Sequence, residues 1–225
     1  MLGLFNSILI RCSIFAIILS STSHAQIDDI GIWSGITLQT KITRQLEVSL
    51  TEQLRLKNDA TRINLFLSDI GLDYEISKKL KVGFHYRYIK SNQENYFSNR
   101  HRFYGDLAWK EKVKFFSITL RERVQEQYSD YYSSETGKIP VWELRSKLTV
   151  KLDLDKKYSP YLSGEIFYLL DNESNEYGLT QYRYETGINY DINRIHSFNP
   201  FLIWQIRHSS KFNELIYGIM YTFSY

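Results

Sequence analysis

Residues 46–56 read LEVSLTEQLRL, and apolar side chains fall on almost every second position. Leu46, Val48 and Leu50 share one parity, while the residues between them are polar or charged. Successive side chains of a β-strand point to opposite faces, so this stretch predicts a strand with one apolar and one polar face. Glu52 is the one polar residue on the apolar face.

The same alternation recurs along the chain. It is clearest in four further segments, residues 68–76, 80–88, 142–152 and 181–192. Weaker versions lie near 30–40, 99–109, 113–125, 160–170, 197–208 and 213–225. The pattern therefore predicts eleven strands of about 10 to 14 residues in an all-β chain, because no segment after residue 26 is apolar for long enough to span a membrane as a helix.

The connections between these segments alternate in length. Short connections are expected near 41–43, 77–79, 110–112, 154–159 and 193–196, and longer ones near 57–61, 91–98, 126–140, 171–177 and 209–212. A transmembrane barrel has tight turns on one side of the membrane and longer loops on the other. A soluble antiparallel sandwich also alternates, but its strands more typically run about five or six residues and its apolar face is an aliphatic interior.

Aromatic residues favour the barrel. The chain is 16% aromatic, and Tyr and Trp prefer the headgroup level of a membrane, where they form girdles around barrels. The apolar parity carries Tyr74, Tyr86, Tyr88, Trp109, Trp142, Tyr168, Tyr182, Tyr184, Tyr190, Trp204, Tyr217, Tyr221, Phe223 and Tyr225. We therefore expect an antiparallel transmembrane β-barrel of about 10–12 strands. Bacterial barrels have an even count, so either one strand is missed or one segment does not span.

Residues 1–25 predict a secretory signal peptide. Arg11 precedes a short apolar core, and small residues lead to a cleavage site after Ala25, which leaves Gln26 as the new N-terminus. A membrane anchor helix is the alternative, but the apolar core is far shorter than the roughly 20 residues that a span needs. The mature chain, residues 26–225, is expected to be one barrel domain in the outer membrane of a Gram-negative bacterium.

The last strand and the composition indicate the partners. Residues 215–225 alternate up to a terminal aromatic and resemble the C-terminal strand that the outer-membrane assembly machinery recognises. That machinery, outer-membrane lipid and lipopolysaccharide are therefore the expected partners. A net charge of only +3 gives no case for nucleic acid, and a single cysteine cannot build a disulfide framework.

Several stretches are similar to a known family. They are IGIW at 30–33, residues 46–56, DIGLDY at 69–74, GFHYRY at 83–88, RHR at 100–102 and RER at 121–123. On these stretches the mature chain resembles bacterial outer-membrane proteins known only as domain of unknown function 2490. The resemblance implies a compartment and a barrel fold, and it supplies no activity or catalytic residues.

The polar parity predicts a lumen lined by charges of both signs. We expect it to contain Asp69, Asp73, His85, Arg87, Arg102, Arg121, Arg123, Glu143, Arg145, Glu165, Arg183 and Glu185. Wide aqueous channels appear only at about 16 strands, so two interpretations stay open. The lumen is either filled by paired arginines and carboxylates or forms a narrow channel lined by arginine. A single-sign ring would favour selective conduction, and this mixture does not.

A lipid-modifying enzyme is the alternative from a different class. His208 and Ser210 share the apolar parity at the end of a strand, and Glu214 follows. This pattern resembles the site of outer-membrane lipid A deacylases, in which His activates Ser and an acid orients the His. Lys211 stands where those enzymes have Asn, and Glu214 is too near and on the other parity. We therefore expect a structural or narrow porin-like barrel without deacylation, and no motif predicts a metal or cofactor.

Overall fold

Each alternating segment forms a β-strand in the computed structural model, which describes residues 27–130, 135–154, 157–171, 176–208 and 212–225. The expected signal peptide over residues 1–25 and the candidate Ser210 lie outside these ranges. The strands are β1 (Asp29–Lys41), β2 (Leu46–Lys57), β3 (Arg62–Glu75), β4 (Leu80–Asn92), β5 (Phe97–Val113), β6 (Phe116–Ser129), β7 (Val141–Leu152), β8 (Tyr158–Asp171), β9 (Gly178–Asp191), β10 (His196–Arg207) and β11 (Phe212–Ser224).

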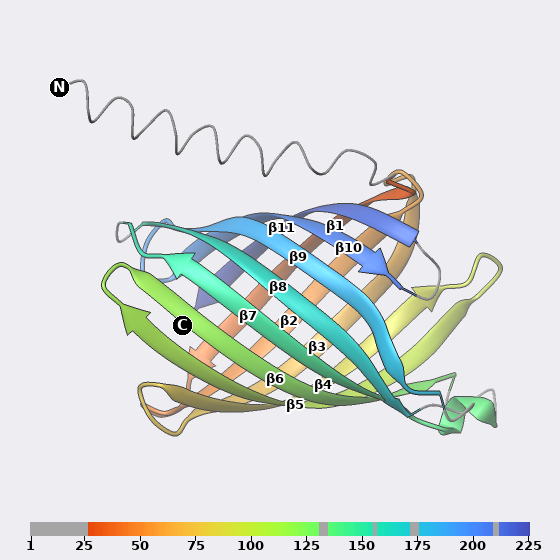
Figure 1. Cartoon of the computed structure of the whole chain (residues 1–225), viewed down its shortest axis with the longest axis horizontal. Coiled ribbons are helices and arrows are strands. Elements are labelled where there is room, and N and C mark those ends of the chain that lie inside the picture. Colours follow the sequence, from red (N-terminus) through yellow and green to blue (C-terminus); the bar gives the residue numbers. More distant parts are fainter. Residues whose placement is uncertain (1–26, 131–134, 155–156, 172–175, 209–211) are drawn as a thin grey trace.

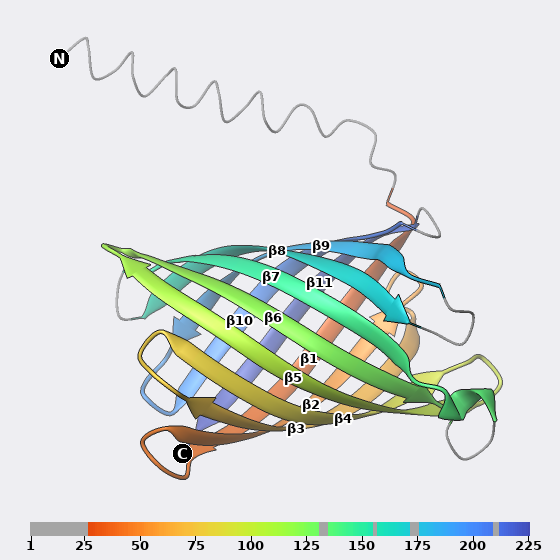
Figure 2. The ribbon, with the colours of Figure 1, turned by 60° about the horizontal axis from the view of Figure 1, so that its bottom comes forward.

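The strands close into one barrel in which each strand pairs with its neighbours in the sequence (Figures 1 and 2). All sequential pairs are antiparallel, whereas β1 pairs with β11 in parallel, from Asp29 opposite Glu214 to Gln39 opposite Ser224. The expected even strand count is therefore wrong for the described residues. With an odd number of up-and-down strands the first and last run in the same direction, so closure needs a parallel ladder.

One end of the barrel, called the turn end below, carries the connections 42–45, 76–79, 114–115, 153–157 and 192–195. Three of these turns are closed by a side-chain oxygen. Thr43, Ser77 and Asn193 each accept the backbone N–H three residues later, at 2.9, 3.1 and 2.8 Å. Ser, Thr and Asn favour turns for this reason, so local sequence fixes these hairpins and their register.

The opposite end, called the loop end below, carries the connections 58–61, 93–96, 130–140, 172–177 and 208–211. Only 130–140 is clearly longer than the turns, because several strands run further than expected. The strand expected over 99–109 extends over Phe97–Val113 as β5. The two ends therefore differ less than the sequence suggested, and the expected alternation of short and long connections does not hold for most of the chain.

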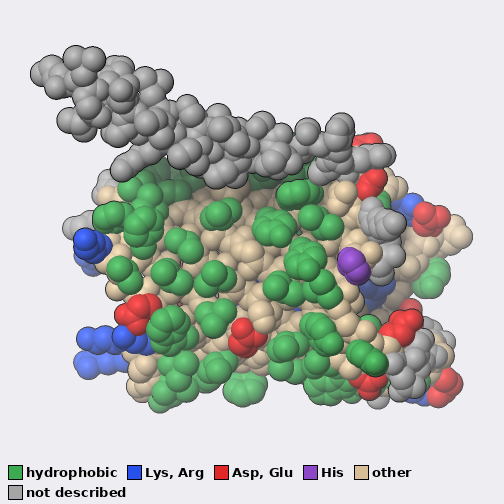
Figure 3. Space-filling view, viewed as in Figure 1, with side chains coloured by type: hydrophobic (Ala, Val, Ile, Leu, Met, Phe, Trp, Pro, Cys, Tyr) green, Lys and Arg blue, Asp and Glu red, His purple; other side chains and the backbone are tan. Residues whose placement is uncertain are grey.

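The barrel is apolar outside and polar inside. Outward side chains such as Phe84 and Leu162 are 70% and 61% exposed, and Figure 3 shows hydrophobic side chains spread over the outer face. Inward side chains such as Asp69 and Glu165 are only 5% and 3% exposed. Among the described residues, no helix has the length and apolar character needed to cross a membrane.

Two glutamates on the outward apolar face, Glu52 and Glu122, are each paired with a serine. Glu52 accepts a hydrogen bond from Ser68 at 2.7 Å, and Glu122 accepts one from Ser146 at 2.5 Å. Each serine lies directly opposite its glutamate on the next strand. The polar exception seen in the sequence at Glu52 is thus satisfied by a cross-strand partner.

A small apolar cluster packs inside the barrel at the closing strands. Trp33, Ile203 and Ile216 are buried together, and Phe201 packs against them. Gly218 lies opposite Phe201 on β11, where a Cβ atom would lie 2.0 Å from the ring. Glycine at this position therefore lets the ring lie against the backbone and fills part of the lumen.

Candidate functional site

The barrel encloses a cavity of about 580 Å³ that is lined mainly by basic side chains. Its lining includes Val141, the first residue of β7, and Arg207, the last residue of β10, so the cavity reaches the loop end. The cationic lining residues are Arg55, Arg87, Arg100, Arg102, Arg121, Arg123, Lys147, Arg145, Arg183 and Arg207. The acidic ones are Glu143, Glu165 and Glu214, which leaves an excess of seven positive charges.

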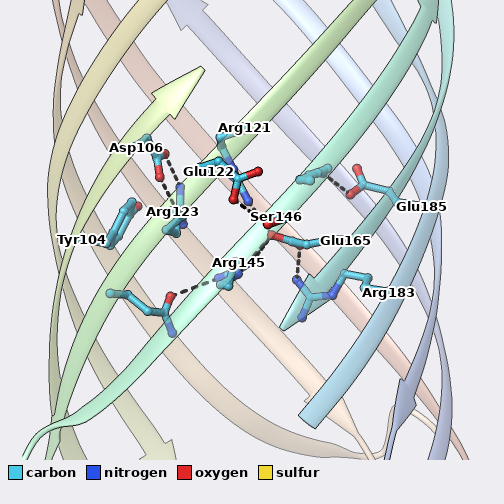
Figure 4. Close-up of polar contacts among 12 residues, drawn as sticks. Tyr104, Asp106, Arg121, Glu122, Arg123, Arg145, Ser146, Glu165, Arg183 and Glu185 are labelled. Carbon is cyan, nitrogen blue, oxygen red and sulfur yellow. Dashed lines mark hydrogen bonds and ion pairs between the residues drawn. The ribbon is translucent and has the colours of Figure 1, made fainter. Parts of the chain in front are cut away.

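One carboxylate organises the wall formed by β6 to β9. Glu165 accepts hydrogen bonds from Arg121 at 2.5 Å and from Arg145 Nε at 3.0 Å, and its second oxygen lies 3.7 Å from Arg183 (Figure 4). The three arginines come from β6, β7 and β9, on both sides of the strand that carries Glu165. We call these four side chains the Glu165 cluster. It ties together four neighbouring strands by charge-assisted hydrogen bonds.

A second set of pairs lies where β3 to β6 meet the lumen. Arg123 donates two hydrogen bonds of 2.6 Å to Asp106, and Arg87 donates one of 2.6 Å to Asp69. The hydroxyl of Tyr104 donates to Asp69 at 2.6 Å, and the guanidinium of Arg123 lies 3.7 Å from the centre of the Tyr104 ring. These two arginines are therefore neutralised within the protein.

Inward aromatic rings hold several of the guanidinium groups in place. Arg55 lies 3.6 Å from the centre of the Trp33 ring, and Arg145 lies 4.3 Å from that of Phe167. Arg183 contacts both rings, at 5.3 and 4.8 Å. Cation–π contacts of this kind stabilise a cation without cancelling its charge, so the ordered arginines remain positively charged toward the cavity.

Three arginines on the wall formed by β2 to β5 have no ion pair within 4.0 Å among the described residues. Arg55 donates to Gln53 at 2.7 Å, and Arg102 donates twice to Gln127, at 3.1 and 2.5 Å. Arg100 Nε is buried without a hydrogen-bond partner in the described part of the chain. Asp69, Asp106 and Glu185 contact other lining cations, and counting them still leaves an excess of four positive charges.

Toward the turn end the polar side chains are matched. Glu185 accepts from Lys147 at 2.8 Å and from Tyr161 at 2.6 Å. On the facing strands, Thr37 and Thr51 share a hydrogen bond of 2.9 Å between their hydroxyls. These inward side chains of the turn half are therefore paired hydroxyls and paired charges.

The structure divides the predicted lumen residues into two groups. Those that line the cavity are Arg87, Arg102, Arg121, Arg123, Glu143, Arg145, Glu165 and Arg183. The other four lie outside its lining and are paired. Asp69 and Asp73 lie 3.4 and 3.7 Å from the two ring nitrogens of His85, and Glu185 contacts Lys147.

Sequence reasoning missed the inward aromatic residues. Tyr104 lies between Arg102 and Asp106 on the polar parity, and Phe167 lies two residues after Glu165. Because Tyr104 and Phe167 share the parity of charged residues two positions away, the sequence could have indicated that they point inward. Aromatic residues were instead expected on the outer girdle. The rings instead order the arginines of the lumen.

The residues of the alternative lipid-modifying site have different environments. His208 is exposed just after β10, and its backbone N–H donates to Thr180 at 2.8 Å. Glu214 is buried in the lumen wall, where it accepts from Gln205 and Arg207 at 3.3 Å each. Ser210 lies outside the described residues, so the three side chains are not seen as a group.

Comparison with known proteins gives a family and distant structural similarities. No curated protein matches the sequence. The outer-membrane expressed OmpT of Vibrio cholerae is 8% identical, with a TM-score of 0.41 over 72% of this chain and 54% of that one, so this chain spans about half its length. The translocator domain of autotransporter NalP from Neisseria meningitidis is also 8% identical, with a TM-score of 0.39 over 78% and 72% of the two chains.

The family match covers most of the barrel, from β1 into β11. The model that matches residues 30–215 is described as a protein of unknown function, DUF2490. This agrees with the resemblance inferred from residues 30–33, 69–74 and 83–88. The chain therefore belongs to the DUF2490 family.

Proposed function

We propose that this protein is an integral outer-membrane barrel whose lumen forms a narrow, anion-selective pathway. The observation that carries the proposal is the arginine-lined cavity, with its excess of positive charge inside a closed barrel. Confined charge of one sign raises the local concentration of the opposite ion and repels ions of like charge. The sequence suggested a balanced lumen, and the cavity is instead strongly basic.

The membrane assignment is supported by the outer surface. Outward residues such as Leu148 and Ile188 are 49% and 44% exposed although they are aliphatic. Contiguous apolar surface on this scale is unfavourable in water and is typical of a lipid-facing belt. The expected signal peptide over residues 1–25 would deliver the chain to the compartment in which such barrels insert.

The pathway is narrow because side chains project into the lumen from its walls. The Glu165 cluster lies on one wall, and Trp33 and Phe201 project from the wall formed by β1 and β10. Eleven strands lie between the roughly eight whose interior side chains fill and the roughly 16–18 of open porins, so the lumen leaves room for a limited cavity and not for a wide channel. The expected conductance is therefore small compared with that of a wide porin.

Planar-bilayer recording of the purified protein tests this function. Under a salt gradient, the reversal potential should show preference for chloride over potassium. A sealed bilayer with correctly folded protein would contradict the pathway, and cation preference would contradict the role of the arginines. Folding is checked independently by circular dichroism and by the altered gel mobility of unheated protein.

We also propose that the outer-membrane assembly machinery recognises β11 through its terminal aromatic residues, and that outer-membrane lipid and lipopolysaccharide surround the barrel. Tyr221, Phe223 and Tyr225 share one parity at the end of the chain. Deleting Tyr225 should lower the amount in the outer membrane and raise periplasmic degradation, as measured by fractionation and immunoblotting. Unchanged levels would leave Tyr225 as part of the girdle alone.

A further inference from the structure

We propose that the cavity is a binding site for a compact polyvalent anion, one that carries two or more phosphate or carboxylate groups. This inference rests on the proposed function and names the substrate class of the same lumen. The ligand would lie against the β2 to β5 wall, where Arg55, Arg100 and Arg102 have no carboxylate partner. The charge, the donor chemistry and the size of the cavity each favour such a ligand.

The charge is concentrated rather than spread. Arg87, Arg102, Arg145 and Arg183 line the same cavity as Arg55, so their like charges repel one another. Placing like charges together inside a barrel is costly unless an opposite charge joins them. One monovalent anion compensates a single charge, whereas the cavity keeps an excess of four even after all contacting carboxylates are counted.

The donors suit oxyanions. Nine of the ten lining cations are arginines, and a guanidinium offers a planar fork that binds carboxylate or phosphate through two parallel hydrogen bonds. The Nε atoms of Arg100 and Arg121 and the amide nitrogen of Gln181 are buried and lack hydrogen-bond partners among the described residues. Buried donors are normally satisfied, so these unmet donors show that the arginine-rich lumen has fewer acceptors than donors, a deficit that an entering oxyanion would reduce.

The size sets an upper limit. A volume of about 580 Å³ lies within the range of roughly 300–1,000 Å³ that small-molecule sites show. The rings of Trp33 and Phe167 hold Arg55 and Arg145 in fixed positions, which lowers the entropic cost of binding. A small polyanion therefore fits, whereas a long polymer would extend beyond the cavity.

The test is calorimetric titration of the purified protein in detergent micelles with four probes: tripolyphosphate, citrate, orthophosphate and acetate. Tripolyphosphate or citrate should bind at least tenfold more tightly than the probe with a single group of the same kind. Preference for tripolyphosphate alone assigns the site to phosphates, and preference for citrate alone assigns it to carboxylates. Equal binding of all four probes, or none, overturns the inference.

A charge-matched pair of variants shows where the anion binds. Replacing Arg55, Arg100 and Arg102 by Gln should abolish the tenfold preference. The control replaces Arg44, Lys78 and Arg194 by Gln, because these exposed residues lie in turns at the other end of the barrel, and it should keep the preference. Equal loss in both variants, or retention in the first, contradicts the site. Should the triple variant not fold, Arg100→Gln alone removes a side chain without a described partner and should weaken binding at least threefold.

The outcome is separable from that of the proposed function. Anion selectivity in bilayers without tight polyanion binding would leave the pathway standing and remove this inference. Tight binding in a barrel that conducts no ions would remove the pathway and keep the site. Tripolyphosphate added to a conducting barrel should block the chloride current at concentrations near its measured Kd.

Discussion

The loop half and the turn half of the lumen bury polar groups in opposite ways. In the loop half, arginines outnumber carboxylates and several are held by aromatic rings or glutamines, as Arg55 is by Trp33 and Arg102 by Gln127. In the turn half, charged groups have partners of opposite charge, as Glu185 has in Lys147. The overall charge of +3 therefore conceals a lumen whose positive charge is segregated toward one end.

This contrast separates a structural role from a binding role. A lumen that only needs to be filled gains most from matched pairs, because each partner offsets the desolvation of the other. An unmatched excess of arginine adds repulsion and does not help the barrel fold. The turn half thus has the chemistry expected of a brace, whereas the loop half has the chemistry of a site for anions.

The largest expected effect is on the Glu165 cluster, at the lower edge of the loop half. Glu165→Gln leaves Arg121, Arg145 and Arg183 without their shared carboxylate. Removing one partner of a buried ion pair costs about 3–5 kcal/mol, so the free energy of unfolding should fall by this amount. Urea titration of folding into lipid vesicles measures the loss.

The matched control for Glu165→Gln is Glu185→Gln in the turn half. Glu185 is held by one lysine and one tyrosine rather than by three arginines. Its loss should cost about 1.5–3 kcal/mol, the range for hydrogen bonds to a charged group. Equal losses of free energy of unfolding in the two variants would mean that buried carboxylates stabilise the two halves to the same extent.

A second prediction tests which side chains of β7 face the lumen and which face the lipid. Leu148→Arg places a charge on the outward face of β7, near mid-strand, and should cost about 2–4 kcal/mol in lipid. Thr149→Arg adds the same charge on the inward face and should cost much less. The same vesicle titration compares them, and similar values would show that the inward and outward faces are assigned one residue out of register.

The sequence predicts which side chains lie on each face of the barrel, but it does not predict how the barrel closes. Alternation at residues 46–56 and at the other segments predicts strands and their two faces, since the period of two is local. Pairing of β1 with β11 is a contact between the ends of the chain, so no local pattern reports it. The bulge between Trp142 and Glu143 is likewise set by the neighbouring strand.

The candidate site was predictable in composition and not in arrangement. Parity identified Arg145, Glu165 and Arg183 as inward, but it gives no height along the barrel axis. Height depends on strand tilt and on the stagger between neighbours, which place Glu165 opposite Arg183 and gather arginines at the loop end. Charges that are interleaved along the chain are for this reason segregated in space.

A third prediction compares the two halves by selectivity. Arg102→Gln removes an unpaired charge from the cavity and should reduce the anion preference in planar bilayers severalfold. Lys81→Gln in the turn half removes a charge already matched by Glu47 and Asp73, at 3.5 and 3.3 Å, and should change it little. The reversal potential in a salt gradient measures both, and a larger effect of Lys81→Gln would place the selective region in the wrong half.

The smallest expected effect concerns uncharged groups, one in each half. Thr51→Val removes the hydroxyl that pairs with Thr37 and should cost about 0.5–1.5 kcal/mol, the usual value of a neutral hydrogen bond, with selectivity unchanged. Gln127→Leu removes the acceptor of two hydrogen bonds from Arg102 and leaves a buried cation without a partner, so it should cost about 1–3 kcal/mol. The difference arises because a neutral partner in the loop half satisfies a charge, whereas in the turn half it satisfies only another hydroxyl. Unfolding in vesicles measures the loss of free energy of unfolding in each variant. Equal losses in Thr51→Val and Gln127→Leu would contradict the difference, because Arg102 would then depend on its neutral partner no more than the hydroxyl of Thr37 does.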